Sequence, residues 1–429
     1  VYKRQHYINS ISKEQVIVEI FFFFLYNEAE NKKGMVMNMN NKNWVSVWGN
    51  AVSIAEHHPE AYAKYITLRY PVYIPFDGDT LRFTFDNFCG SEAVTVTRAT
   101  VSAATSPVYE KMPLACPCKK ETICDITFSK NESVTMEAHQ TAVSDPVSFP
   151  VKKGMILTVS LYFADFTLMQ SAVLVTGPLS KGFFSLGDQT HAKSLPMNDT
   201  KTTNWFYFLS NIELMTSEEN HMVICYGDSI TAGAWPDYLT LLARENPDNH
   251  TAFIRRATSG SRILRQYECI TYDSYGLKGT NRFPHEIPTT GADTVIIQQG
   301  INDIIHPVGI ETNPFRPMSD LPTARELIDG YRYYIEEAKK LHLKVYMGTL
   351  LPIFGWRTYA TFRDDLRNEV NAWIRSTKEI DGCIDFDLAL RGEDNPSAFR
   401  EGFDSGDHLH PSSKAYKAMA ECAYEVLRK

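Results

Sequence analysis

Residues 221–246, HMVICYGDSITAGAWPDYLTLLAREN, decide how the second half of this chain folds. The run His221–Gly227 is short and apolar, which is typical of a strand buried on both faces. A helical pattern follows from Ala234 to Asn246. A strand that passes through a short polar turn into a helix is the first unit of an alternating α/β sheet.

The same alternation continues to the end of the chain. Further buried-strand runs are DTVIIQQG (293–300), LKVYMGTLLP (343–352) and GCIDFDLAL (382–390), and helices are predicted over 323–342, 362–377 and 412–429. Strands that alternate with helices in this way form a parallel sheet with helices on both faces. We therefore predict an α/β three-layer sandwich over residues 216–429, with its ligand beyond the carboxyl ends of the strands.

Residues 35–215 have a different period. Apolar and polar residues alternate in LRFTFDNF (81–88), AVTVTRATVSAA (93–104) and MILTVSLYF (155–163), between segments that contain Asn, Gly, Pro and Lys. Short runs of period two at this spacing predict an all-β sandwich or jelly roll. The polar stretch TSEEN (216–220) separates the two halves and is too short for a free linker.

Residues 1–34 are expected to be poorly ordered or foreign to the fold, with Met35 or Met37 as the natural start. Their apolar run, Val16–Tyr26, is interrupted by Glu19 and is too short to span a bilayer as a helix. No small-x-small cleavage site follows this run, so a signal peptide is not indicated and a cytoplasmic location is slightly favoured.

The charge balance argues against nucleic acid as a partner. The chain has 43 Lys and Arg against 51 Asp and Glu, a formal net charge of −8, and it lacks the clustered cations that neutralise phosphates. Eight scattered cysteines do not make a disulfide scaffold. Cys116, Cys118 and Cys124 lie close in sequence, but a zinc site needs four ligands and no partner pair is evident. We interpret these three residues as free thiols.

Two loops at strand ends contain a candidate nucleophilic site. Ser229 stands in the turn between the first buried strand and its helix, where a serine hydroxyl is exposed near a positive helix end. Such a serine is also a common N-cap, and Thr231 breaks the G-x-S-x-G elbow pattern. Asp407 and His410, before the last helix, could supply a base and the carboxylate that orients it. A surface turn, or a metal site that adds His408, is the alternative.

Two further positions could stabilise an oxyanion. Gly260, in RRATSGS (255–261) after the second strand, lets a backbone N–H approach a ligand without a side chain in the way. Asn302, in GIND (300–303) at the end of the third strand, offers an amide donor at the same edge of the sheet. Each residue is ordinary alone, but together they follow one another at successive strand ends and predict one site.

GDS at 227–229, Gly260, GxND at 300–303 and DxxH at 407–410 resemble the four sequence blocks of the SGNH, or GDSL, hydrolase superfamily. The resemblance covers residues 221–429 and implies a flavodoxin-like sheet of about five parallel strands. It implies a serine ester hydrolase without cofactor or metal, with Ser229 as nucleophile, His410 as base and Asp407 as the residue that orients the base. The implied oxyanion hole consists of the Ser229 and Gly260 N–H groups and the Asn302 side chain.

Three segments of the β half are NWVSVWGNA (43–51), LRFTFDNFCGSEAVTVTRATVS (81–102) and SDPVSFPVKKGMILTVSLYF (144–163). They resemble the domain that precedes the hydrolase in one bacterial branch, which includes acetylxylan-esterase-like enzymes. This similarity implies a small-molecule or carbohydrate ester as substrate, with short acyl groups, chiefly acetyl. A lipase or thioesterase is one alternative, and a carbohydrate-binding protein with an inert hydrolase half is another. Trp235 and Trp356 could stack on a sugar, although packing between helix and sheet is favoured. No membrane span is expected, and the oligomeric state is left open.

Overall fold

The computed structural model describes residues 42–54, 62–266 and 275–428. Residues Trp44–Lys429 pack as one compact unit. The prediction for residues 1–34, with their apolar run, lies outside the described residues. Of the helices in the described part of the chain, none combines the length and the apolar character that a membrane crossing needs.

The second half folds as the predicted α/β sandwich. Its sheet has the strand order β20-β19-β21-β22-β23, and every neighbouring pair is parallel. The strands are β19 (His221–Gly227), β20 (Thr251–Ala257), β21 (Ala292–Gln298), β22 (Lys344–Gly348) and β23 (Gly382–Ile384). The first strand of this sheet is β19. The second, β20, pairs on one side of it and the other three follow on the opposite side, so the order is the flavodoxin-like 2-1-3-4-5.

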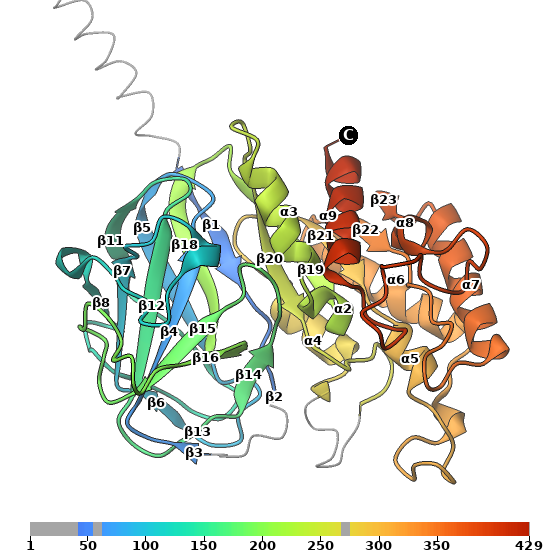
Figure 1. The fold of residues 1–429 in the computed structure, drawn as a ribbon, viewed down its shortest axis with the longest axis horizontal. Coiled ribbons are helices and arrows are strands. Elements are labelled where there is room, and N and C mark those ends of the chain that lie inside the picture. Colours follow the sequence, from blue (N-terminus) through green and yellow to red (C-terminus); the bar gives the residue numbers. More distant parts are fainter. Residues whose placement is uncertain (1–41, 55–61, 267–274, 429) are drawn as a thin grey trace, which may run out of the picture. The chain divides into compact units, whose positions relative to one another are not determined.

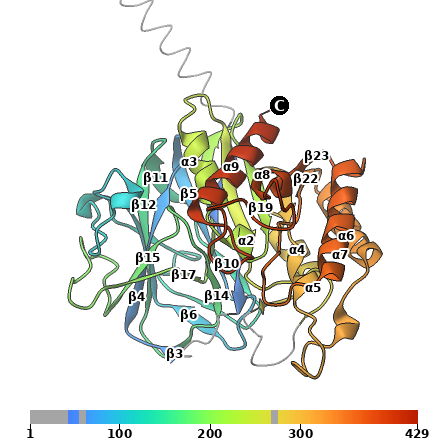
Figure 2. The same ribbon diagram turned by 45° about the vertical axis from the view of Figure 1, so that its right-hand side comes forward.

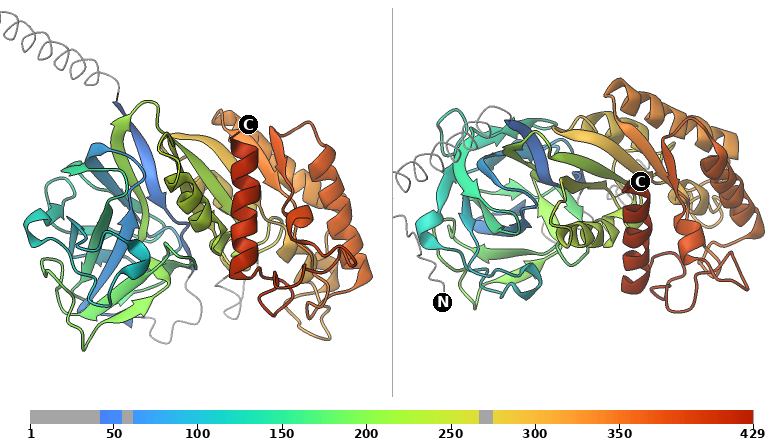
Figure 3. Two further views of the ribbon diagram at one scale, coloured as in Figure 1. Left: turned by 45° about the horizontal axis from the view of Figure 1, so that its top comes forward. Right: turned by 90° about the horizontal axis from the view of Figure 1, so that it is seen from above.

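Helices cover both faces of this sheet (Figure 1 and Figure 3, right). Helix α3 packs against α9 on one face, whereas α4, α6 and α7 pack in succession on the other. The helices are α2 (Ser229–Ala232), α3 (Trp235–Arg244), α4 (Gly279–Glu286), α5 (Ile301–Ile305), α6 (Ala324–Lys340), α7 (Thr361–Ser376), α8 (Phe386–Leu390) and α9 (Ser413–Leu427). The fold class is therefore confirmed as a three-layer sandwich.

One predicted strand is wrong in its second part. GCIDFDLAL (382–390) continues as a strand only to Ile384, and the helix α8 follows from Phe386. The Asp385 side chain causes the change, because it accepts a hydrogen bond from the backbone N–H of Leu388 and so caps the helix. The same carboxylate forms an ion pair with Arg375 of α7, which fixes the cap against its neighbour.

The first half consists mainly of β-strands, as predicted, and it contains two main sheets. One has the order β1-β18-β5-β10 with β11 also on β5, and the other has the order β16-β15-β4-β12-β7-β8. Their strands are β1 (Lys42–Gly49), β4 (Ile66–Tyr73), β5 (Gly78–Asp86), β7 (Arg98–Ala103), β8 (Cys124–Ile126), β10 (Thr141–Val143), β11 (Val147–Val151), β12 (Ile156–Phe163), β15 (Gly182–Leu186), β16 (Lys201–Thr203) and β18 (Leu209–Ser217). Shorter pairings involve β2 (Ser53–Ile54), β3 (Tyr62–Ala63), β6 (Val94–Val96), β9 (Val134–Met136), β13 (Thr167–Leu168), β14 (Ser171–Leu174) and β17 (Trp205–Tyr207).

The strand β12 differs from a half-buried strand, because all of its residues are buried. Loops cover its polar face, and the fully buried Arg69 holds them there. Its guanidinium donates to the Ser160 hydroxyl and to backbone carbonyls of Cys116, Gln189 and Ala192. Cys116, Cys118 and Cys124 belong to the same region, and all three are free thiols.

The strand β20 contains two buried arginines that join the halves. Arg255 and Arg256 were expected after the second strand, but both lie inside it. Successive residues of a strand point to opposite faces, so the two side chains leave β20 in opposite directions. Arg255 forms an ion pair of 2.7 Å with Asp237 of α3 and donates to the Ser180 hydroxyl of the β half.

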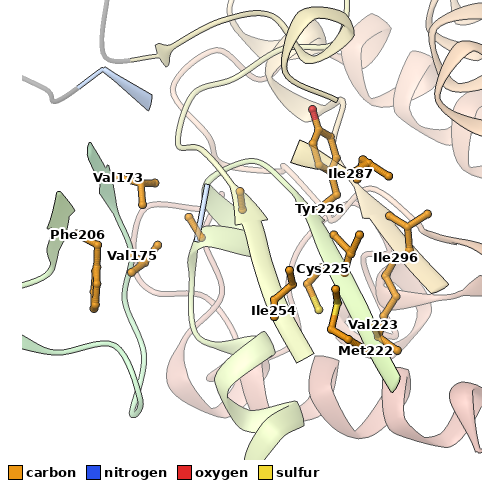
Figure 4. Close-up of a cluster of buried hydrophobic side chains, with 14 of the residues drawn as sticks. Val173, Val175, Phe206, Met222, Val223, Cys225, Tyr226, Ile254, Ile287 and Ile296 are labelled. Atoms are coloured by element: carbon orange, nitrogen blue, oxygen red, sulfur yellow. The ribbon is translucent and has the colours of Figure 1, made fainter. Parts of the chain in front are cut away.

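The guanidinium of Arg256 is satisfied by oxygen atoms from both halves. It donates to the carbonyl oxygens of Asn50 and Ser210 in the β half, at 2.6 and 2.9 Å, and to the carbonyl oxygen of Glu286 in α4. Apolar side chains make the same connection. One buried cluster contains Val173 of β14 together with Ile254 of β20 (Figure 4).

The change from antiparallel to parallel structure takes place within a few residues. The strand β18 ends at Ser217 and β19 begins at His221, and the Asn220 side chain donates to the Thr216 hydroxyl across this turn. A free linker is thus absent at this point. The division into domains at 35–215 and 216–429 stays a prediction, since residues 44–215 and 216–429 lie in one compact unit, Trp44–Lys429.

We expect Arg256→Met to destabilise the whole unit by about 2–5 kcal/mol, because the carbonyl oxygens of Asn50, Ser210 and Glu286 would lose a buried charged donor. Urea unfolding followed by circular dichroism measures this change. The control is Arg325→Met, whose side chain is 90% exposed and which should shift the free energy of unfolding by less than about 0.5 kcal/mol. Equal effects of the two changes would show that Arg256 does not hold the halves together.

Candidate functional site

Ser229 lies at the carboxyl end of the central strand β19, as the first residue of α2 (Figure 2). Gly227 ends the strand where a Cβ atom would come within 2.3 Å of the Gln298 carbonyl oxygen, so only glycine fits there. Asp228 caps the short helix, because its side chain accepts a hydrogen bond of 3.0 Å from the Ile230 N–H. These contacts fix the backbone on both sides of Ser229.

The structure brings Ser229, His410 and Asp407 together from distant parts of the sequence. The Ser229 Oγ atom lies 2.9 Å from His410 Nε2, and His410 Nδ1 lies 2.6 Å from Asp407 Oδ2. With the proton on Nδ1 donated to the carboxylate, Nε2 presents its lone pair to the serine hydroxyl. This is the geometry that a nucleophile, its base and an orienting carboxylate require.

The loop before α9 holds the Asp407 carboxylate in place. Its Oδ1 atom accepts hydrogen bonds from the backbone N–H groups of Leu409 and His410. Partial burial raises the pKa of Asp407, but the hydrogen bonds from the His410 ring and from these backbone groups outweigh burial and lower the pKa to about 2. Asp407 is therefore ionised at neutral pH, as a residue that stabilises an imidazolium must be.

Two other carboxyl groups near the nucleophile have the opposite character. Burial is the main cause that raises the pKa of Asp228 to about 7 and that of Asp303 to about 6. Both groups accept backbone hydrogen bonds, Asp228 from Ile230 and Asp303 from Ile263 and Leu264. Their backbone hydrogen bonds shape the loops around the site, and their pKa values lie well above that of Asp407.

The second histidine of the loop has a separate partner. His408 Nδ1 lies 2.6 Å from Asp404 Oδ2, and its backbone has a positive φ of 66°. Both ring nitrogens of His410 are already engaged by Ser229 and Asp407. The metal interpretation of Asp407, His408 and His410 therefore finds no converging set of ligands at this loop. Across the described ranges, no group of three His, Cys, Asp or Glu side chains could hold a metal ion.

Gly260 and Asn302 lie next to each other, linked through Ser261. Gly260 has a φ of 75°, a left-handed conformation that glycine adopts without strain. The Asn302 Nδ2 atom donates to the Ser261 carbonyl oxygen at 3.2 Å. The turn that contains Gly260 is tied to the end of β19, because the Thr258 N–H donates to the Gly227 carbonyl oxygen. The two predicted oxyanion residues thus lie close together: Gly260 is in a turn tied to the strand that carries Ser229, and Asn302 is in α5, which follows the neighbouring strand β21.

Sequence reasoning missed the residues that hold these loops. Asp303 binds the backbone N–H groups of Ile263 and Leu264, at 2.9 and 3.0 Å. Arg282 of α4 donates to the Ser261 hydroxyl at 2.9 Å. The GIND pattern contained Asp303 as a signal, whereas nothing in the local sequence of α4 indicates where Arg282 points.

The two tryptophans considered as sugar platforms differ in exposure. Trp235 is fully buried, donates to the Thr231 hydroxyl at 3.3 Å and packs near Phe386, so packing between helix and sheet is confirmed for it. Trp356 is half-buried, and the Arg357 guanidinium lies 4.6 Å from its ring centroid. Trp235 is unavailable for stacking on a ligand.

Comparison with known proteins adds a family match for this half. Residues 225–418 match the model of the GDSL-like lipase/acylhydrolase family. A solved GDSL-like lipase from Bacteroides thetaiotaomicron is 20% identical over 49% of this chain and 89% of that one, with a TM-score of 0.36. An acetylxylan esterase from Geobacillus stearothermophilus is 16% identical over 48% and 93%, with a TM-score of 0.35. The search of curated proteins gave no match.

The matched residues include the last three residues of β19, the other four strands of the parallel sheet, and all five residues of the candidate site. The strand order is the one expected of such a hydrolase. The match of residues 225–418 to the GDSL-like lipase/acylhydrolase family indicates that this part of the chain is a hydrolase of ester bonds.

Proposed function

We propose that this chain cleaves carboxylic esters through an acyl-enzyme on Ser229, and that its substrates are short-chain, chiefly acetyl, esters of carbohydrate. The observation that carries the proposal is the continuous hydrogen-bonded series from the Ser229 hydroxyl through the His410 ring to the Asp407 carboxylate. A turn residue that served only as an N-cap would not need a histidine at 2.9 Å.

Acylation starts when Ser229 Oγ attacks the ester carbonyl carbon and its proton passes to His410 Nε2. The carbonyl π electrons move to oxygen, and Asp407 stabilises the imidazolium that forms. The tetrahedral intermediate then collapses, the bond to the alcohol oxygen breaks, and His410 returns the proton to the leaving alcohol. The products of this half-reaction are the free alcohol and an acyl ester of Ser229.

Deacylation repeats the sequence with water. His410 Nε2 removes a proton from a water molecule, whose oxygen attacks the acyl carbon. Collapse of the second tetrahedral intermediate releases the carboxylic acid and returns the proton to Ser229 Oγ. In both intermediates the negative oxygen needs donors, for which we propose the N–H groups of Ser229 and Gly260 and the Asn302 amide.

The surroundings of Gly260 favour a short acyl group. A Cβ atom on Gly260 would lie 2.2 Å from the Tyr275 ring, and this ring stacks on His306 with centroids 5.0 Å apart. An aromatic ring so close to the proposed oxyanion donors restricts the room for a long acyl chain. On the other side, the His410 and Asp407 side chains are 32% and 42% exposed, which leaves access for a bulky, hydrated alcohol such as a sugar.

We expect Ser229→Ala to lower kcat for p-nitrophenyl acetate by at least about a thousandfold while the fold is retained, because the attacking atom is removed. Steady-state kinetics and the melting temperature are measured on the same sample. Ser194→Ala, a matched change at an exposed position, should leave both quantities unchanged. Residual activity above roughly 1% of the wild-type kcat would rule out Ser229 as the nucleophile.

Acyl length distinguishes the proposed esterase from a lipase or thioesterase. We expect kcat/KM for p-nitrophenyl acetate to exceed that for the octanoate ester by at least about tenfold, since the Tyr275 ring limits the acyl side. Release of acetate from acetylated xylo-oligosaccharides tests the carbohydrate part. A preference for octanoate would favour the lipase reading, and binding of the sugar without turnover would favour an inert hydrolase half.

Asn302→Ala should lower kcat by roughly 10²–10³-fold, or about 2.7–4 kcal/mol, if the amide is an oxyanion donor. KM should change little, because the ground-state carbonyl is bound less strongly than the oxyanion. The side chain also donates to the Ser261 carbonyl oxygen, so a purely structural role is the competing explanation. A lower melting temperature with an unchanged kcat of the folded enzyme would support that explanation and refute the catalytic role.

A further inference from the structure

A polar cavity of about 210 Å³ lies where the β half meets α4. Its walls come from β5, β10 and β18 of the β half, from the residues after β1, and from β20 and α4 of the hydrolase half. None of Ser229, Gly260, Asn302, Asp407 and His410 lines it. The exposed residues Thr141 and Thr290 belong to its lining, so the cavity is open to solvent on their side.

The charged groups of this cavity are already balanced. Each of its three carboxylates has a basic partner: Asp86 with His285, Glu213 with Arg82, and Glu286 with Arg282. Arg256 donates to carbonyl oxygens and to the Asn211 side chain. Since burial of an uncompensated charge is costly, a cavity whose charges are already matched suits a neutral ligand.

Uncharged polar groups on the walls lack partners of their own. The side chain of Asn50, a residue only 4% exposed, makes no hydrogen bond to the described residues, and neither does the hydroxyl of Thr84. An amide supplies two donors and an acceptor, and a hydroxyl supplies one donor and accepts as well. Neither side chain is among those whose polar atoms are buried without a partner, so both face the open part of the cavity, where they can bind a ligand or water.

The volume of the cavity distinguishes a ligand from a single water molecule. A single water needs only about 10–15 Å³ measured in this way, so the cavity has room for a small organic molecule. A sugar unit matches the lining, because each of its hydroxyls both donates and accepts hydrogen bonds and the molecule is uncharged. We propose that this cavity binds a neutral polyhydroxylated ligand, a sugar unit, at a site separate from the ester-hydrolysing one.

The probes are D-xylose and xylobiose, titrated into the full chain by isothermal titration calorimetry. We expect saturable binding with a Kd on the order of 1 mM or tighter. Asn50→Ala and Thr84→Val should each raise this Kd by about fivefold or more, because each removes a hydrogen bond to the ligand. Thr84→Val keeps a β-branched residue in β5 and remains informative where Asn50→Ala folds poorly. Tighter binding of xylobiose identifies a chain of sugars as the ligand, and equal binding identifies a free monosaccharide.

Two controls separate this site from the proposed active site and from unspecific effects. Ser229→Ala should bind the sugars as the wild type does, so the result does not depend on the proposed function. Asn198→Ala, the same type of change at an exposed residue of the β half, should leave the Kd unchanged. Three outcomes would overturn the proposal: no saturable heat with either sugar, a Kd unaffected by both cavity variants, or tighter binding of sodium acetate than of the sugars.

Discussion

Two guanidinium groups buried on successive residues of one strand are the constraint on which the rest of the structure depends. A buried cation is tolerated only when its donors are satisfied, and the acceptors around Arg255 and Arg256 come from both halves of the chain. Neither half alone provides the full set. The strand that carries the Gly260 turn is therefore fixed in place by residues of the β half, far from the reacting atoms.

The sequence pattern was sufficient to predict the elements whose structure depends on interactions between residues near in sequence. The four long helices follow from an apolar face at helical spacing, and Thr323 with Glu326 form a capping box at the start of α6. Pattern failed where distant partners decide. Two adjacent arginines look like a loop, yet Asp237 and carbonyls of the β half make them strand residues. A local signal was also missed after Ile384, where the run looks like a strand but the Asp385 side chain caps the N-terminus of a helix.

The residues of the candidate site could be predicted from the sequence, whereas most of the residues that hold its loops could not. Parallel strands end at one edge, so residues directly after β19, β20 and β21 were bound to lie close together, and Ser229 meets His410 there at 2.9 Å. The carboxyl groups show why sequence alone stops short of function. Asp228, Asp303 and Asp407 all lie in the recognised blocks. Burial raises the pKa of Asp228 and Asp303, whereas hydrogen bonds lower the pKa of Asp407.

The position of β20 at the border of the parallel sheet has a consequence for how this chain can be divided. A border strand presents N–H and C=O groups that pair readily with another chain, and such strands drive edge-to-edge aggregation when they are uncovered. Here the strand also carries the apolar contact of Ile254 with the cluster that includes Val173. A hydrolase half that began at residue 221 would expose this edge strand and the side chain of Ile254, and we expect it to aggregate. The β half therefore also helps to keep the hydrolase half in solution.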